Sequence, residues 1–237
     1  MPLTSGDRPE WLTFDCYGTL IQWDEGLKET AARVIGARRA DADPDAIVEP
    51  YDQHESELEK NAPFKTFRQL APAAFRTALG ELGVDATEED GRTLLDAISS
   101  FIPFPDTLDT LAALKAGGFR IALISNTDDD LIAGNVAQLG GHVDHVVTAE
   151  QARSYKPSRL IFEHARSALG IDYDQMVHVC ASPGLDHAAA RDQPFRCVWI
   201  DRDTYRKPLA DYTADETLPT LTGLPDLFAK LGWMANR

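Results

Sequence analysis

The sequence has no long apolar run and is short of basic residues. None of its 237 residues falls in a segment that approaches the roughly twenty apolar residues of a membrane-spanning helix. Its 23 lysines and arginines are outnumbered by 38 aspartates and glutamates, which leaves a formal net charge of −15. This deficit argues against nucleic acid or an anionic membrane as a partner, because phosphate groups attract basic surfaces. Residues 1–8 also lack the apolar core of a signal peptide, so a cytoplasmic location is expected.

Cysteine is scarce as well. The three cysteines, Cys16, Cys180 and Cys197, lie far apart and within apolar runs. An odd and scattered set does not form a disulfide framework, and neither the cysteines nor the histidines have the spacing of a metal site. We therefore expect reduced thiols in the core and predict no metal ligands.

Short apolar runs rich in β-branched residues recur along the chain. Helical patterns at residues 107–115 and 158–169 alternate with the later runs. Such alternation predicts an α/β fold with a doubly wound, mainly parallel sheet and helices on both faces. The predicted strands are residues 11–15, 119–125, 142–149, 176–181 and 196–201.

The stretch between the first and second predicted strands does not alternate. Helical patterns follow one another at residues 24–39, 67–82 and 87–101. They predict an inserted helical cap over residues 21–102, with residues 1–20 and 103–237 as the core domain. The prolines at 103 and 105 mark the return to the core, since proline breaks helices. After residue 208 we expect a loop-like tail with one short helix at 224–231.

Polar side chains stand where the predicted strands end or the following helices begin. Asp15 ends the first strand, Ser125-Asn126 end the second, Lys156 precedes a helix, and Asp186 follows the fourth strand. Each has an ordinary structural explanation as a helix cap or a surface charge. The carboxyl ends of parallel strands meet at one edge of a sheet, however, and there these side chains converge. Together they indicate an active site.

The motifs also resemble a known family. The segments are Phe14-Asp15-Cys16-Tyr17-Gly18-Thr19-Leu20, Ser125-Asn126, Tyr155-Lys156-Pro157 and residues 198–202. Over essentially the whole chain they resemble the haloacid dehalogenase (HAD) superfamily, and within it the L-specific 2-haloacid dehalogenases. The resemblance implies a Rossmann-like core, a mechanism without cofactor, and a homodimer as one possible state.

The resemblance also assigns roles to individual residues. Asp15 would be the nucleophile, Lys156 would hold its carboxylate, and Asp186 would orient Lys156 or activate water. Substrate-binding positions are expected at Cys16, Tyr17, Thr19, Ser125, Asn126 and Ser182.

Tyr17 favours the dehalogenase branch. Most phosphatases of the superfamily place an aspartate there as general acid, and a phenol supplies neither a strong acid nor a further metal ligand. A halide leaves as a weak base and needs no acid. The predicted activity is hydrolysis of a small anionic 2-haloalkanoic acid: Asp15 attacks the halogen-bearing carbon, and water cleaves the resulting ester to a 2-hydroxy acid.

Two departures leave alternatives open. The enzymes that the first motif resembles receive the halide on a cap arginine, but residues 47–55 are acidic and contain none; Arg33, Arg38, Arg39 and Arg68 are the candidates nearby. The fourth motif, residues 181–186, keeps Asp186 but lacks a serine and an asparagine of the family pattern. The alternatives are a HAD phosphatase and a HAD-fold protein with little or no turnover.

Overall fold

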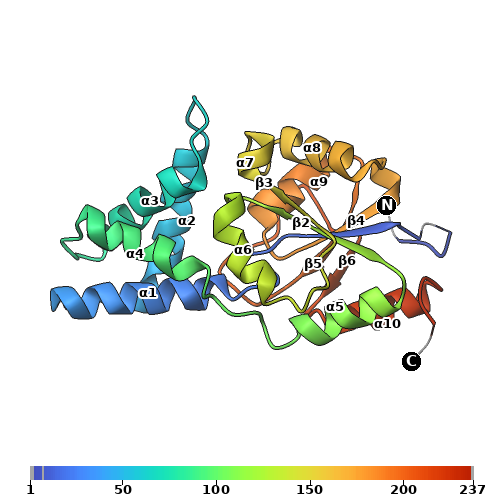
Figure 1. Ribbon diagram of the computed structural model, residues 1–237, viewed down its shortest axis with the longest axis horizontal. Helices are drawn as coiled ribbons and strands as arrows, with labels where there is room; N and C mark the ends of the chain where they lie inside the picture. The colour runs from blue at the N-terminus through green and yellow to red at the C-terminus, as the bar shows by residue number, and fades with distance from the viewer. Residues whose placement is uncertain (1–2, 7, 236–237) are drawn as a thin grey trace.

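A six-stranded parallel sheet forms the centre of the molecule in the computed structural model, which describes residues 3–6 and 8–235 (Figure 1). The strand order is β3-β2-β1-β4-β5-β6, so the chain winds outward from β1 in both directions and the predicted doubly wound fold is confirmed. The strands are β1 (Trp11–Phe14), β2 (Arg120–Ser125), β3 (His145–Thr148), β4 (Met176–Cys180), β5 (Arg196–Ile200) and β6 (Glu216–Leu218).

Alternate residues of each central strand enter different cores. Leu12 and Phe14 of β1 pack on one face of the sheet, and Trp11 packs on the other. Helices α5 (Thr107–Ala116) and α10 (Gly223–Lys230) cover the first face, and α8 (Arg159–Leu169) and α9 (Ala188–Asp192) the second (Figure 1). Because both faces are covered, the central strands are mostly apolar, and their polar residues Thr13 and His178 are buried as well.

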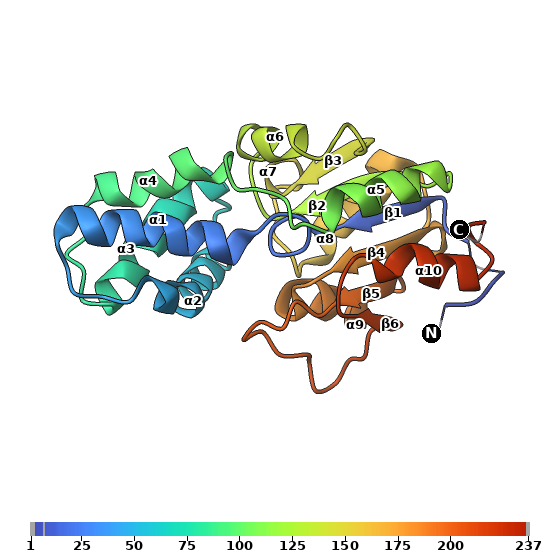
Figure 2. The ribbon, with the colours of Figure 1, turned by 90° about the horizontal axis from the view of Figure 1, so that it is seen from below.

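Four helices between β1 and β2 form a separate bundle to one side of the sheet (Figures 1 and 2). They are α1 (Trp23–Arg38), α2 (Val48–Glu59), α3 (Phe67–Glu81) and α4 (Glu88–Ile98), with a 3₁₀ turn at Pro44–Ile47. Reciprocal capping boxes begin α3 at Thr66 and α4 at Thr87. The helical insertion predicted from the sequence is therefore present.

The two connections between the insertion and the sheet run side by side. The Gln22 N–H donates to the Ile102 carbonyl and the Phe104 N–H to the Leu20 carbonyl, both at 2.9 Å. Ile21 also forms an isolated antiparallel bridge with Pro103. The domain boundaries at 20/21 and 102/103 stay predictions, but the paired connections place the bundle firmly at the sheet edge.

Several short elements escape the sequence patterns. The prediction of a loop-like tail after residue 208 is wrong at β6, where the chain forms a three-residue strand at the sheet edge. Helix α2 has only Val48 and Tyr51 buried and five acidic residues, so it carries little apolar periodicity. The remaining elements are α6 (Asp129–Ala137), α7 (Ala149–Ala152), a 3₁₀ turn at Tyr173–Gln175 and a π turn at Pro183–His187.

Residues 1–2 and 7, part of the segment on which the expected cytoplasmic location rests, lie outside the described residues. Within residues 3–6 and 8–235, no helix combines the length and the apolar character needed to cross a membrane.

Candidate active site

Asp15, Lys156 and Asp186 meet at the carboxyl edge of the sheet, as their positions in the sequence predict. The Lys156 ammonium donates to Asp15 Oδ1 at 2.7 Å and to Asp186 Oδ1 at 2.9 Å. All three side chains are buried. Buried charges are stable only when they are paired and hydrogen-bonded. Lys156 meets this need for both carboxylates at once and so fixes their positions.

Neighbouring groups fix the two carboxylates further. The Thr19 hydroxyl donates to Asp15 Oδ2 at 2.6 Å and accepts the Ala181 N–H at 2.9 Å. His178 Nε2 lies 3.0 Å from Asp186 Oδ1. The second oxygen, Asp186 Oδ2, is buried and has no hydrogen-bond partner within the described residues. It is therefore the one oxygen of the two carboxylates that forms no hydrogen bond within the described residues.

Burial affects the two carboxylates unequally. Burial raises the pKa of Asp15 above its usual value, and Lys156 opposes that rise. Burial alone would also raise the pKa of Asp186, but Lys156 and His178 bring it below the usual value. For Lys156, the two carboxylates outweigh the cost of burial and raise its pKa. Lys156 therefore carries its charge at neutral pH, and Asp186 ionises before Asp15.

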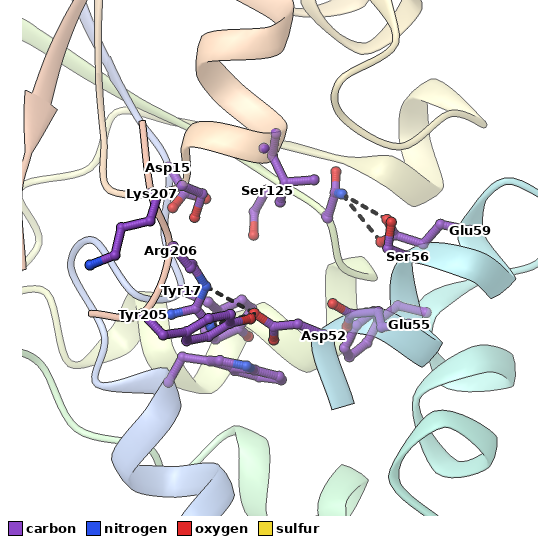
Figure 3. Close-up of a pocket in the computed structure, with 16 residues that line it drawn as sticks. Asp15, Tyr17, Asp52, Glu55, Ser56, Glu59, Ser125, Tyr205, Arg206 and Lys207 are labelled. Carbon is purple, nitrogen blue, oxygen red and sulfur yellow. Dashed lines mark hydrogen bonds and ion pairs between the residues drawn. The ribbon is translucent and has the colours of Figure 1, made fainter. Parts of the chain in front are cut away.

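A cavity of about 340 Å³ opens above Asp15, between the sheet edge and the inserted bundle (Figure 3). Its walls come from β1, β2, the turn after β4, the loop after β5 and helices α1, α2 and α3. The lining residues are Asp15, Tyr17, Trp23, Asp52, Glu55, Ser56, Glu59, Phe67, Ser125, Asn126, Ser182, Gly184, Leu185, Tyr205, Arg206 and Lys207.

Comparison with known proteins agrees with this geometry. Residues 10–180 match the family described as haloacid dehalogenase-like hydrolase. The chain belongs to this family. The match includes Asp15 and Lys156 and ends just before the altered fourth motif.

Relatives named for an activity are 27% and 29% identical to this hydrolase over the aligned residues. An (S)-2-haloacid dehalogenase of Pseudomonas sp. (strain YL) is 29% identical over 176 residues, 73% of this chain and 75% of that protein. Haloacetate dehalogenase H-2 of Moraxella sp. (strain B) is 27% identical over 165 residues, 69% and 73% of the two chains. The structure of L-2-haloacid dehalogenase from Xanthobacter autotrophicus superposes with a TM-score of 0.81 at 20% identity, covering 92% and 98%. That last likeness concerns the fold.

The predicted substrate-binding residues divide into two groups in this hydrolase. Tyr17, Ser125, Asn126 and Ser182 line the cavity, and for them substrate contact stays a prediction. Cys16 and Thr19 are fully buried and are not among the lining residues. Burial raises the pKa of the Cys16 thiol, and the Thr19 hydroxyl is already engaged by Asp15. The Thr19 hydroxyl therefore holds the Asp15 carboxylate from beneath the cavity, and substrate contact by Cys16 or Thr19 stays a prediction.

Asn126 is occupied by the protein itself. Its side-chain oxygen accepts the Lys156 N–H at 2.7 Å, and its amide nitrogen donates to the Lys156 carbonyl at 3.2 Å. The same nitrogen lies 3.2 and 3.3 Å from the two Glu59 carboxylate oxygens. Asn126 thus fixes the main chain of Lys156 and meets a carboxylate of the inserted bundle.

Tyr17 keeps its proton and forms part of an aromatic wall. Its hydroxyl donates to Asn135 Oδ1 at 2.9 Å, away from Asp15. Its ring lies 5.0 Å from that of Trp23, centroid to centroid. Burial raises the pKa of Tyr17 well above its usual value. A phenol in this state is a poor general acid.

The arginine of the cavity does not come from the inserted bundle. Arg33, Arg38, Arg39 and Arg68 are not among the lining residues, and three of them are paired elsewhere: Arg33 with Glu29, Arg38 with Asp90 and Arg68 with Asp130. The candidates named from the sequence are therefore wrong.

Arg206 and Lys207 supply the cavity's cations, from the loop after β5. Arg206 binds both oxygens of Asp24, at 2.9 and 3.0 Å, and its Nε donates to Asp52 Oδ2 at 2.9 Å. These two residues were not predicted from the sequence. The signal for them is the position of their loop, which follows a strand at the ligand-binding edge of the sheet.

Two buried groups have atoms close enough to hold one metal ion. They are Cys180, His187 and Cys197, and His178, Cys180 and Asp186; within each group the ligand atoms lie within 4.8 Å of one another. None of these residues lines the cavity. Spacing along the chain does not reveal the first group, because the pairing of β4 with β5 brings Cys197 to Cys180; the second group lies within β4 and the turn after it.

Proposed function

We propose that this hydrolase cleaves the carbon–halogen bond of a small 2-haloalkanoic acid through an ester on Asp15. The observation that carries the proposal is the Lys156 ammonium, which holds Asp15 and Asp186 together beneath the cavity. Related proteins named as 2-haloacid and haloacetate dehalogenases support the substrate class.

In the first step an Asp15 oxygen attacks the halogen-bearing carbon. The new oxygen–carbon bond forms as the carbon–halogen bond breaks, and the halide departs with the electron pair. Lys156 and Thr19 hold the carboxylate in the attacking orientation. Ser125 Oγ, which has no partner in the described part of the chain, can bind the substrate carboxylate, and Arg206 and Lys207 are the lining cations that can receive the halide.

In the second step water attacks the carboxyl carbon of Asp15. The bond between that carbon and the former Asp15 oxygen breaks, so the product hydroxyl contains an oxygen from Asp15 and the enzyme keeps one from water. Asp186 Oδ2 is suited to take the proton from the attacking water, because it is ionised and has no other partner. That proton passes to the product alkoxide, and the second proton of the water leaves to solvent.

The phosphatase alternative lacks its usual acid. Tyr17 occupies that position, and its hydroxyl donates to Asn135. One observation favours the alternative of little turnover. Arg206 is paired with Asp24 and Asp52, so much of its charge is neutralised and less is available to receive a halide.

The test is single-turnover hydrolysis in heavy-oxygen water. Chloroacetate, fluoroacetate and racemic 2-chloropropionate are incubated with excess enzyme, halide is measured, and the Asp15 peptide is weighed. We expect halide release, one heavy oxygen in Asp15, and a loss of about a thousandfold or more in Asp15→Asn. Magnesium-dependent hydrolysis of an aryl phosphate without any halide release would contradict the proposal and favour the phosphatase. Absence of both reactions would favour a protein with little or no turnover.

We also propose a cytoplasmic location, supported by three buried cysteines that are all free thiols.

A further inference from the structure

Helix α2 forms an acidic roof over the cavity, which we define as Asp52, Glu55 and Glu59 (Figure 3). These residues are three and four positions apart and therefore lie on one face of the helix. With Asp15 below, four carboxylates line the cavity, against the two cations Arg206 and Lys207. This is an unusual lining for a site that takes a purely anionic substrate, since like charges repel strongly at short range.

The cations do not neutralise the roof evenly. Arg206 pairs with Asp52 and with Asp24, so its charge is matched within that group. Glu55 accepts the Tyr51 hydroxyl at 2.9 Å, and Glu59 accepts only the Asn126 amide. Among the described residues, neither glutamate has an ion-pair partner. In an empty cavity these two half-buried glutamates hold protons in place of a cation, and a cationic ligand would compensate their charges once they ionise.

A second, independent feature indicates that the cavity is shaped for a polar ligand. Ser125 is 1% exposed and its hydroxyl has no hydrogen-bond partner in the described structure. Figure 3 shows Ser125 between Asp15 and Glu59, with its hydroxyl toward the cavity. Buried hydroxyl groups are normally satisfied, so this one is available to a bound molecule.

We propose that Glu55 and Glu59 bind a positively charged group of the substrate, an ammonium or amidinium carried on the part remote from the carbon that Asp15 attacks. The inference rests on the proposed function for the reacting end of the molecule, where Ser125 binds the carboxylate. The substrate is then a zwitterionic 2-haloacid. The cationic group takes no part in the bond changes and determines which haloacid is accepted.

The test compares substrates that differ in one charge. Racemic 2-chloro-4-(trimethylammonio)butanoate is matched in shape by 2-chloro-5,5-dimethylhexanoate, in which carbon replaces the cationic nitrogen. 2-Chlorosuccinate supplies a remote anion. We expect kcat/KM for chloride release to be about 10- to 100-fold higher for the cation than for its neutral isostere, because the two glutamates attract its charge, and lowest for 2-chlorosuccinate. Equal or better use of the neutral isostere overturns the proposal.

Variants locate the preference. The double variant Glu55→Gln/Glu59→Gln should reduce the ratio between cation and isostere to about one, largely through KM. Glu57→Gln is the matched control, because Glu57 is exposed on the same helix and is not a lining residue. A ratio that the double variant leaves unchanged overturns the assignment to these residues. If the double variant does not fold, the single variants and the substrate comparison on the unchanged enzyme decide.

Binding separates this inference from the proposed function. Calorimetry on the unchanged enzyme compares the unreactive analogues 4-(trimethylammonio)butanoate and 5,5-dimethylhexanoate. Tighter binding of the cation with no chloride release from any compound would reject the dehalogenase and retain the cation site. Equal binding of the two, or no binding of either, overturns the cation site whatever the chloride measurements show.

Discussion

Asn126 holds the main chain of Lys156 through two hydrogen bonds, whereas the adjacent Ser125 hydroxyl has no partner among the described residues. Asn126→Ala leaves the buried Lys156 N–H without an acceptor. We expect the free energy of unfolding to fall by about 1–3 kcal/mol. Ser125→Ala, the matched control, removes no hydrogen bond of the protein and should change it by less than about 0.5 kcal/mol. Urea unfolding measures both, and equal losses would contradict this assignment.

Glu55 should make stability depend on pH. Burial is the main reason that its pKa is about 8 in place of the usual 4.5; Asp52 adds to the rise, and Tyr51 and Arg206 oppose it. Glu59, on the next turn of the helix, also faces it. The folded chain therefore keeps a proton that the unfolded chain loses. This stabilisation is fully present below pH 4.5 and is lost as the pH rises to about 8.

Urea unfolding of the enzyme and of Glu55→Gln, at about pH 5 and about pH 8.5, measures this effect. Glutamine cannot ionise, so the variant should lose less stability over this interval than the unchanged enzyme. Glu57→Gln, on the exposed side of α2, should behave like the unchanged enzyme. Parallel pH profiles for all three proteins would exclude a raised pKa at Glu55.

At the scale of elements, α3 and α4 approach closely at a glycine. A Cβ added at Gly91 of α4 would lie 2.5 Å from the Pro72 carbonyl oxygen of α3, which is backbone and cannot turn aside. Gly91→Ala should therefore lower the free energy of unfolding by about 1–3 kcal/mol, although alanine is the better helix former.

Gly36 in α1 provides the matched control. A Cβ there meets nothing within 4 Å, so Gly36→Ala should raise the free energy of unfolding by about 0.5–1 kcal/mol. Thermal or urea unfolding compares the two variants. A stabilising Gly91→Ala would show that the two helices can separate without cost.

At the scale of the whole molecule, the net charge of −15 affects stability through self-repulsion. Raising the ionic strength to about 0.5 M with sodium chloride screens repulsion between exposed charges. We expect the midpoint of thermal unfolding to rise by about 2–4 °C, which corresponds to about 1 kcal/mol in a chain of this size. An unchanged or lower midpoint would mean that ion pairs outweigh the repulsion.

The larger elements could be predicted because their signals are local. The buried strands are mostly apolar runs, and α3 and α4 carry apolar residues at helical spacing. Helix α2 and strand β6 could not be predicted, because α2 has only two buried residues and β6 is only three residues long. Both matter for the site: α2 provides its roof, and β6 follows the loop that carries Arg206. The possible homodimer stays a prediction.

The sequence by itself determined the family, the doubly wound sheet and the convergence of Asp15, Lys156 and Asp186, because strand ends in such a sheet always meet at one edge. Only the tertiary structure decided what stands opposite them. Whether Asn126 faces the cavity or holds Lys156, and whether the cation comes from the bundle or from the β5 loop, depends on how two separately patterned parts of the chain pack together. The acidic roof above Asp15 is the result of that packing, and no spacing within the sequence encodes it.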